Sequence, residues 1–304
     1  MKAELIKKFL EADHRENIER AAVALKPILL NTRLIRSEFF SREHGCNVFM
    51  KPENLQRTGS FKIRGAYNKI SSLTAEEKKH GVISSSAGNH AQGVAYSARE
   101  KGIRSTIVMP NVTPLLKVDA TKAYGSKVIL HGDVYDEAYR YAMELSERDG
   151  YTFVHPFDDY DVICGQGTIG PEILKELPET DEILIPIGGG GLISGIALAI
   201  KTMKPSVKII GVVPAGAMAM KISLEEGQVS RLASLKTVAE GVAVKQPGDL
   251  TFAITQKYVD DIITVTEKEI MEAVLLLIEK HKIVAETAGA ISLAGLRKRT
   301  AKDK

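Results

Sequence analysis

Short β-rich runs alternate with amphipathic helical stretches along this chain, and the alternation restricts the folds open to it. A first series of such elements covers roughly residues 50–150, and a second series follows it. Parallel strands need a crossover, usually a helix, and the helices then cover both faces of the sheet. The sequence therefore predicts an α/β fold with two open, mostly parallel sheets and helices on both faces.

The predicted elements can be given by residue number. The strands are 82–84, 105–109, 127–130, 182–187, 208–213 and one within 258–265. The helices are 90–101, 113–124, 134–149, 192–204, 217–227, 266–282 and 288–298. Thr266 and Glu269 have the spacing of a capping box, which predicts that a helix begins there.

Four consecutive glycines, Gly188, Gly189, Gly190 and Gly191, lie between a predicted strand and a predicted helix. Without Cβ atoms the backbone can approach an anion closely, and the N–H groups at a helix N-terminus bind phosphate. The nucleotide fingerprints fail, because Gly189-x-Gly191 leads to Ser194 and no Gly-Lys-Ser/Thr follows. The loop is therefore predicted to hold a small phosphate-bearing ligand, with a simple tight turn as the alternative.

Lys62 lies in the segment 58–66, TGSFKIRGA, beside the ring of Phe61 and inside a Gly/Ser turn. Small neighbours and a ring suit burial, and desolvation lowers the pKa of a lysine and frees its amine as a nucleophile and base. Such a lysine can hold an aldehyde cofactor as a Schiff base, with the phenyl ring packed on the cofactor plane. The alternative is an ordinary solvated lysine.

A third candidate segment, Ser86 to His90, follows the predicted strand 82–84 and opens a predicted helix. Backbone N–H groups at this position can bind a carboxylate, and Asn89 can donate to a phenolic oxygen on a ring. The alternative is that Ser86 or Asn89 only caps the helix.

Composition disfavours several other functions. The 304-residue chain has a net charge of only +3 and its basic residues are dispersed, so neither a nucleic-acid nor a membrane partner is expected. Its two cysteines, Cys46 and Cys164, are too few for a disulfide framework or a zinc set, which fits a reducing cytoplasm. Residues 1–14 mix acidic residues with lysines and lack the apolar run of a signal peptide.

The chain closely resembles the threonine dehydratase and serine racemase family, which are fold type II pyridoxal-phosphate enzymes with a tryptophan-synthase-β-like fold. The resemblance covers nearly the whole chain. It rests on the segments 53–66, 86–93, 165–168, 188–192, 239–242 and 286–290, which match family blocks in the expected order.

The resemblance implies roles around one pyridoxal 5'-phosphate. Lys62 would carry the cofactor and later move the Cα proton of the substrate. Phe61 would pack on one face of the ring, with Gly241 near the other and Glu286 nearby, and Asn89 would bond the phenolic oxygen. The phosphate would be held by Gly188, Gly189, Gly190 and Gly191. The substrate carboxylate would be held by backbone N–H groups of Ser86, Ala87, Gly88, Asn89 and His90.

The reaction that the resemblance implies is β-elimination of an amino acid that carries a β-hydroxyl. The cofactor acts as an electron sink, so L-threonine would give 2-oxobutanoate and L-serine pyruvate, each with ammonia. Both isoleucine biosynthesis and threonine degradation use this reaction. The resemblance also implies a homodimer or homotetramer.

Three departures from the family pattern leave alternatives open. Racemases of the family carry a serine base where this chain has Ala87, so elimination is favoured and a racemase is the alternative. Segment 211–220 has no carboxylate, so no metal ion is expected there. The chain has no Ser-Gly-Gly after Leu296, so a truncated, catalytically impaired cofactor-binding chain is a further alternative.

The expected organisation is a large cofactor-binding domain formed by residues 1–50 and 151–304, with a small domain over residues 51–150. No C-terminal regulatory domain is expected.

Overall fold

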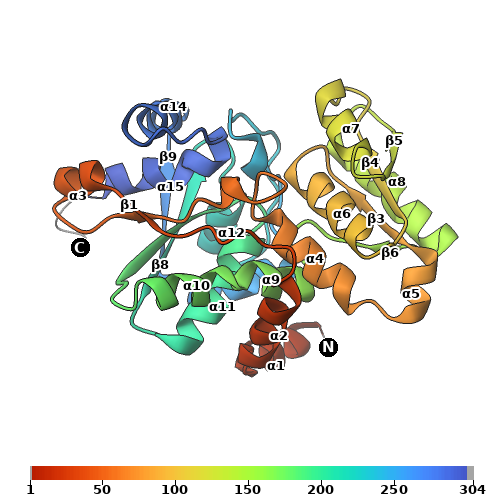
Figure 1. Cartoon of the computed structure of the whole chain (residues 1–304), viewed down its shortest axis with the longest axis horizontal. Coiled ribbons are helices and arrows are strands. Elements are labelled where there is room, and N and C mark those ends of the chain that lie inside the picture. The colour runs from red at the N-terminus through yellow and green to blue at the C-terminus, as the bar shows by residue number, and fades with distance from the viewer. Residues whose placement is uncertain (1, 300–304) are drawn as a thin grey trace. The chain divides into compact units, whose positions relative to one another are not determined.

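The computed structural model describes residues 2–299, which form two compact units, each with its own sheet (Figure 1). Of the described residues, the larger unit contains 2–16, 31–54 and 167–299, and the smaller unit contains 17–30 and 55–166. The polar end of the chain beyond residue 299 lies outside the described residues.

The smaller unit is built on a four-stranded parallel sheet with the order β5-β4-β3-β6. The register pairs Ile83 with Thr106 and Val108 with Ile129. The elements lying wholly or mostly in this unit are α2 (Arg15–Leu25), α4 (Lys62–Ser72), α5 (Ala75–His80), β3 (Val82–Ser85), α6 (Asn89–Glu100), β4 (Ser105–Met109), α7 (Leu115–Lys122), β5 (Lys127–Leu130), α8 (Tyr135–Asp149), β6 (Thr152–Phe153) and α9 (Tyr160–Gly167).

Helices cover both faces of this sheet because successive strand side chains point in opposite directions. Val82 packs with Val94 of α6, whereas the next residue, Ile83, packs with Ala138 and Ala142 of α8. All of these side chains are fully buried. The near-continuous apolar strands of the sequence are therefore explained by burial on both sides.

The larger unit contains a three-stranded parallel sheet with the order β7-β8-β9. Helices α15 and α11 pack on it from opposite sides, as Figure 1 shows. The elements of this unit are α1 (Lys2–Glu11), β1 (Ile35–Arg36), α3 (Glu38–His44), β2 (Phe49–Met50), α10 (Ile169–Glu176), β7 (Glu182–Pro186), α11 (Gly191–Met203), β8 (Lys208–Pro214), α12 (Ala219–Glu226), α13 (Asp249–Tyr258), β9 (Asp261–Val265), α14 (Glu267–Leu276) and α15 (Thr287–Lys298).

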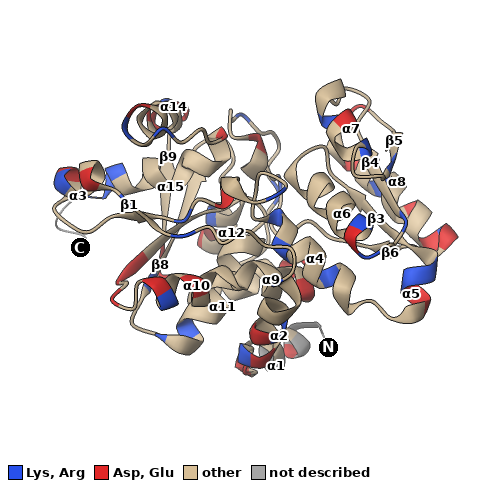
Figure 2. Ribbon diagram, viewed as in Figure 1, with Lys and Arg blue, Asp and Glu red and all other residues tan. Residues whose placement is uncertain are grey.

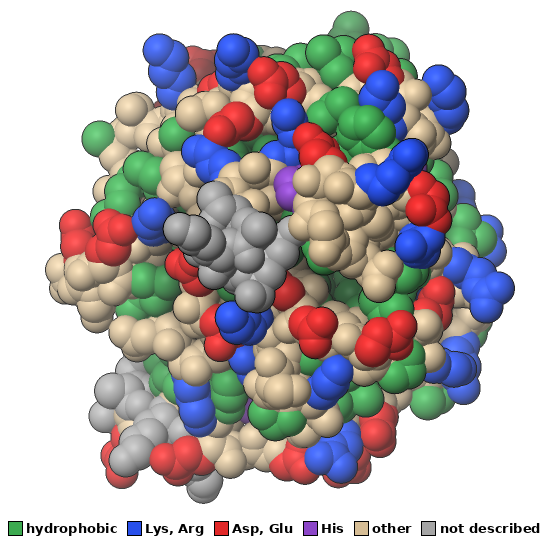
Figure 3. Space-filling model, turned by 90° about the vertical axis from the view of Figure 1, so that its left-hand side faces the viewer, with side chains coloured by type: hydrophobic (Ala, Val, Ile, Leu, Met, Phe, Trp, Pro, Cys, Tyr) green, Lys and Arg blue, Asp and Glu red, His purple; other side chains and the backbone are tan. Residues whose placement is uncertain are grey.

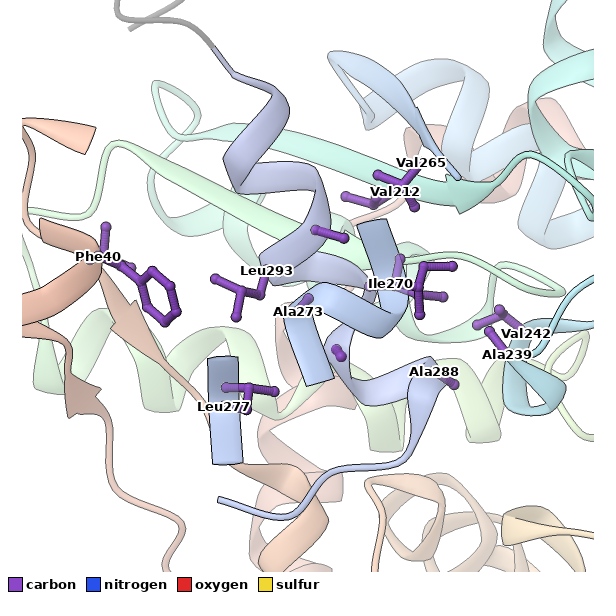
Figure 4. Close-up of a cluster of buried hydrophobic side chains, with 14 residues drawn as sticks. Phe40, Val212, Ala239, Val242, Val265, Ile270, Ala273, Leu277, Ala288 and Leu293 are labelled. Carbon is purple, nitrogen blue, oxygen red and sulfur yellow. The ribbon is translucent and has the colours of Figure 1, made fainter. Parts of the chain in front are cut away.

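The main core of the larger unit lies between α14, α15 and the sheet (Figure 4). Ile270 and Ala273 of α14 pack with Leu293 of α15 and Val212 of β8, and Phe40 of α3 closes one end. Of these side chains only Leu293 retains measurable exposure. Burial of this apolar surface provides most of the driving force for docking α14 and α15 onto the strands.

The structure confirms the predicted α/β class with two mainly parallel sheets, and β4 and β5 match the predicted strands at both ends. Thr266 and Glu269 form the predicted capping box. The helix predicted over 266–282 differs, because α14 ends at Leu276 and a π-helical turn follows over Leu277–His281. Lys282 then adopts a positive φ of 58° and terminates the helix.

Charged side chains of both signs are spread over the described residues (Figure 2). They are also intermixed on the face drawn in Figure 3. Among residues 2–299, no helix is long and apolar enough to cross a membrane.

Truncating Ile270 tests the importance of the core of the larger unit. Ile270→Ala removes a fully buried side chain, so we expect the free energy of unfolding to fall by about 2–5 kcal/mol. The matched control is Met271→Ala on the same helix, whose side chain is 44% exposed and whose loss should change stability by about 0.5 kcal/mol or less. Urea unfolding followed by circular dichroism measures both, and equal losses would contradict this packing.

Candidate active site

Lys62 is the first residue of α4, at the point where the Gly/Ser turn ends. Phe61 is the helix N-cap and already has helical backbone angles. The Lys62 Nζ donates to the carbonyl oxygen of Pro156 at 2.8 Å and lies 5.5 Å from the centre of the Phe61 ring. The amine and the ring are therefore adjacent, as the sequence predicted, and the amine is held at a defined position.

The loop before α6 carries the second predicted segment. Gly88 is the helix N-cap and has no side chain that could cap, so the alternative of capping by Ser86 or Asn89 does not describe this helix start. Two of the five N–H groups proposed for a carboxylate are engaged within the protein. Ser86 N–H donates to Val108 O at 3.3 Å, and Gly88 N–H donates to the Ser86 Oγ at 3.2 Å. Ser86 and Gly88 would have to give up these bonds before their N–H groups could bind a carboxylate.

Two histidines, His90 and His155, accompany Lys62 in the smaller unit. His90 Nε2 lies 3.0 Å from Val154 O, and because a carbonyl only accepts, this nitrogen carries the proton. His155 Nδ1 accepts from the backbone N–H groups of Phe157 and Asp158, so its proton is on Nε2. His155 was not predicted as a site residue, because the alternation of strands and helices does not indicate which residues lie near a given lysine.

Both imidazoles are held in the neutral form. Burial, together with the positive charge of Lys62, lowers the pKa of His90 to about 3 and that of His155 to about 4. His90 Nδ1 is buried and makes no hydrogen bond with any described residue. His90 and His155 therefore add no positive charge beside Lys62.

The helix that begins at Lys62 is also fixed from the side of α9. Gln166 Oε1 accepts from the backbone N–H of Gly65 at 3.2 Å, and Asn68 Nδ2 donates to the carbonyl oxygen of Asp161 at 2.7 Å. The bond from Gly65 to Gln166 gives the 165–168 segment a structural role at the start of α4.

In the larger unit the four glycines connect β7 to α11. Gly190 is the N-cap of α11 and has a φ of +95°, which L side chains rarely adopt. A Cβ there would also lie 2.9 Å from the Thr251 Cβ. The first N–H groups of this 13-residue helix follow directly after a loop without side chains, which is the arrangement that binds phosphate.

Thr251 of α13 supports the glycine loop and was not predicted from the sequence. Its Oγ1 donates to the carbonyl oxygen of Gly189 at 2.7 Å and accepts from the Gly248 N–H at 3.1 Å. Its own carbonyl oxygen accepts from the hydroxyl of Ser194 in α11. Thr251 is completely buried, so its hydroxyl fixes the loop from the side opposite to solvent.

The remaining predicted residues of the larger unit gather beside this loop. A Cβ on Gly188 would lie 2.9 Å from Val242 Cα, and a Cβ on Gly241 would lie 3.3 Å from Glu286 Oε1. Figure 4 shows Val242 and Ala288, the neighbours of these residues, at one end of the core. Segments separated by 45 residues or more in the sequence are thus brought together within this unit.

The residues of the predicted site are divided between the two units. Phe61, Lys62 and the 86–90 loop belong to the smaller unit, whereas Gly188–Gly191, Gly241 and Glu286 belong to the larger unit. The amine of the first part fits an aldehyde, and the side-chain-free cradle of the second part fits a phosphate group.

Comparison with known proteins agrees with this chemistry. A family model described as pyridoxal-phosphate dependent enzyme matches residues 25–304. L-threonine ammonia-lyase of Thermotoga maritima is 50% identical over 281 residues, which cover 92% of this chain and 70% of that protein. L-threonine dehydratase catabolic TdcB of Escherichia coli is 45% identical over 281 residues, covering 92% of this chain and 85% of that protein.

Solved structures show the same relationship. Threonine deaminase isoform 2 from Solanum lycopersicum has a TM-score of 0.89 at 43% identity, covering 92% of this chain and 77% of that chain. Maize serine racemase has a TM-score of 0.90 at 36% identity, covering 93% of this chain and 85% of that chain. A lyase and a racemase thus share the fold, so the fold alone does not choose the reaction. With a lysine presented beside a ring, a glycine cradle at a helix N-terminus and a family match over most of its length, the chain belongs to the pyridoxal-phosphate-dependent enzyme family.

Proposed function

We propose that this protein is a threonine ammonia-lyase that converts L-threonine to 2-oxobutanoate and ammonia, and L-serine to pyruvate and ammonia. Relatives at 50% and 45% identity carry the names L-threonine ammonia-lyase and L-threonine dehydratase. The observation that carries the proposal is the Lys62 amine, held at 2.8 Å from Pro156 O in surroundings that keep His90 and His155 uncharged.

The cofactor contacts that we propose are those that the family resemblance implies. Pyridoxal phosphate carries its aldehyde and its phosphate on one ring, so Lys62 and the glycine loop would serve the same molecule. Phe61 and Gly241 would face the ring, Asn89 would bond its phenolic oxygen, and Glu286 would lie near it. The N–H groups of the 86–90 loop would bind the substrate carboxylate.

Proton transfer at the substrate Cα would depend on Lys62. When bound, the cofactor supplies an electron sink for the negative charge that develops at Cα. Lys62 Nζ would remove the Cα proton, and the β-hydroxyl would leave as water after protonation. Hydrolysis of the released enamine by water would then give ammonia and the 2-oxo acid. Ala87 has no proton to transfer, which favours elimination over racemisation.

The cellular role belongs to the same proposal. The name of the Escherichia coli relative, L-threonine dehydratase catabolic TdcB, favours threonine degradation over isoleucine biosynthesis. We propose a homodimer or homotetramer from the family resemblance, and a large and a small domain that correspond to the two units. A cytoplasmic location is proposed because Cys46 and Cys164 are both free thiols.

Replacing Lys62 tests the covalent link to the cofactor. Lys62→Ala should lose the visible absorption band of the lysine-bound cofactor and reduce elimination by about 10²–10⁴-fold or more, because the amine both holds the cofactor and moves the proton. The matched control is Lys78→Ala on the exposed side of α5, which should keep both the absorption band and the elimination activity. Retention of the band in Lys62→Ala would refute the assignment.

The reaction itself is tested with the purified holoenzyme and L-threonine or L-serine. We expect 2-oxobutanoate or pyruvate to form in step with ammonia, and little D-amino acid to appear, because Ala87 supplies no second base. Chiral chromatography and a 2-oxo acid assay on the same sample measure both products. If D-serine forms faster than pyruvate, the protein is a racemase instead.

Replacing Thr251 tests the support of the glycine loop. Thr251→Val keeps the shape but removes the bonds to Gly189 and Gly248, so we expect the dissociation constant of pyridoxal phosphate to rise by about tenfold. Thr251→Ser keeps the hydroxyl and should stay near the original value. Titration of the cofactor-free protein followed by absorption gives the constants, and equal values for the two variants would contradict the proposed support.

A further inference from the structure

A polar cavity lies in the smaller unit between α2, α4 and α9, and none of its lining residues belongs to the predicted site. Its volume is about 360 Å³, which is in the range of cavities that hold small ligands. The lining residues are Asn17, Arg20, Asn68, Ser72, Asp161 and Cys164. The three helices that supply them are marked in Figure 1.

The positive group of this cavity is Arg20. Its Nη2 donates to Asn17 Oδ1 at 2.6 Å, and it forms no ion pair with an acidic residue within the described part of the chain. Asn17 is itself held in place, because its Nδ2 donates to the hydroxyl of Tyr160 at 2.8 Å. A guanidinium that is oriented but not neutralised is suited to bind a carboxylate through two parallel hydrogen bonds.

The negative group is Asp161, at the start of α9. Its Oδ2 accepts from the Ser72 hydroxyl at 3.0 Å and lies 3.4 Å from the Lys69 Nζ. Its Oδ1 accepts no hydrogen bond from any described residue, and neither does the Oδ1 of Asn68. The cavity therefore offers two further acceptor oxygens, of which one carries negative charge, and these suit an ammonium group.

Cys164 contributes no competing charge. Burial raises the pKa of its thiol to about 12, so the sulfur is protonated at neutral pH. One unneutralised cation and open acceptor oxygens are thus what the cavity presents to a ligand.

We propose that this cavity binds the zwitterion of a free α-amino acid, with its carboxylate on Arg20 and its ammonium on the open oxygens of Asp161 and Asn68. A carboxylate alone would contact only Arg20, and an ammonium alone would contact only Asp161 and Asn68. The complete zwitterion makes both sets of contacts and therefore binds more tightly than either part. Arg20 supplies the charge-assisted contact that anchors the ligand.

The cavity is distinct from the surroundings of the Lys62 amine, although both involve α4. Asn68 and Ser72 lie six and ten residues beyond Lys62, which is roughly 9 and 15 Å along the helix axis at about 1.5 Å per residue. Amino-acid binding here therefore does not require the proposed chemistry of Lys62.

The test uses the holoenzyme and N,N-dimethylglycine, a zwitterion whose tertiary amine cannot form a Schiff base with the cofactor. Isothermal titration calorimetry should detect binding without any change in the cofactor absorption band. Acetate and methylammonium, titrated separately, should each show a dissociation constant at least about tenfold higher than that of N,N-dimethylglycine. Acetate that binds as tightly as the zwitterion would overturn the proposed ligand class.

Variants then locate the site. Arg20→Gln should weaken binding about tenfold or more, and Arg20→Lys should fall between it and the unaltered protein, because a point charge replaces the planar fork. Arg15→Gln removes the same charge from an exposed position of α2 outside the cavity and should bind normally. Circular dichroism confirms that each variant is folded. Equal affinity of Arg20→Gln and Arg15→Gln, or no binding to the unaltered protein at millimolar concentrations, refutes the site.

Lys62→Ala separates this proposal from the proposed function. The variant should bind N,N-dimethylglycine like the unaltered protein even though it lacks elimination activity. Loss of binding in Lys62→Ala would place the ligand at the cofactor and overturn the second site.

Discussion

The parallel pairing of the strands is the constraint on which the rest of the structure depends. A parallel sheet needs helical crossovers on both faces, so its strands are apolar on both sides and its polar loops collect at the strand ends. The 86–90 loop follows β3, and the four glycines follow β7, each at the carboxyl end of its strand. Ligands of open α/β sheets bind at this edge, because the next helix there presents its free N–H groups.

Close backbone packing then turns the glycine loop into a defined cradle. Gly190 takes a conformation that other residues rarely adopt, and the buried hydroxyl of Thr251 donates a hydrogen bond to the carbonyl oxygen of Gly189. The 241–242 segment packs against Gly188 and the 286–288 segment packs against Gly241, because neither glycine carries a side chain. A phosphate cradle of this type consists of backbone groups, so its precision comes from the residues around it rather than from charged side chains.

Burial sets the electrostatics around Lys62. The two neighbouring histidines stay neutral because they are desolvated and lie near a positive charge, and their protons are fixed by backbone partners. Elsewhere in the smaller unit the same helix, α4, contributes Asn68 and Ser72 to a cavity that retains an unneutralised arginine. One helix therefore carries the proposed proton-transfer group at its start and residues of the proposed amino-acid cavity near its end.

The sequence alone determined the α/β class, most of the strands, the capping box at Thr266 and the residue types of the candidate site. These features follow from local periodicity and from the backbone demands of glycine, which act over a few residues. Only the tertiary structure decided that Thr251 supports the glycine loop, that His155 lies near Lys62, and that Arg20 and Asp161 share a cavity. It also decided that α14 gives way to a π-helical turn, and it paired the two-residue strands β1 and β2. These features depend on contacts between residues far apart in the chain, and no short pattern in the sequence encodes such contacts.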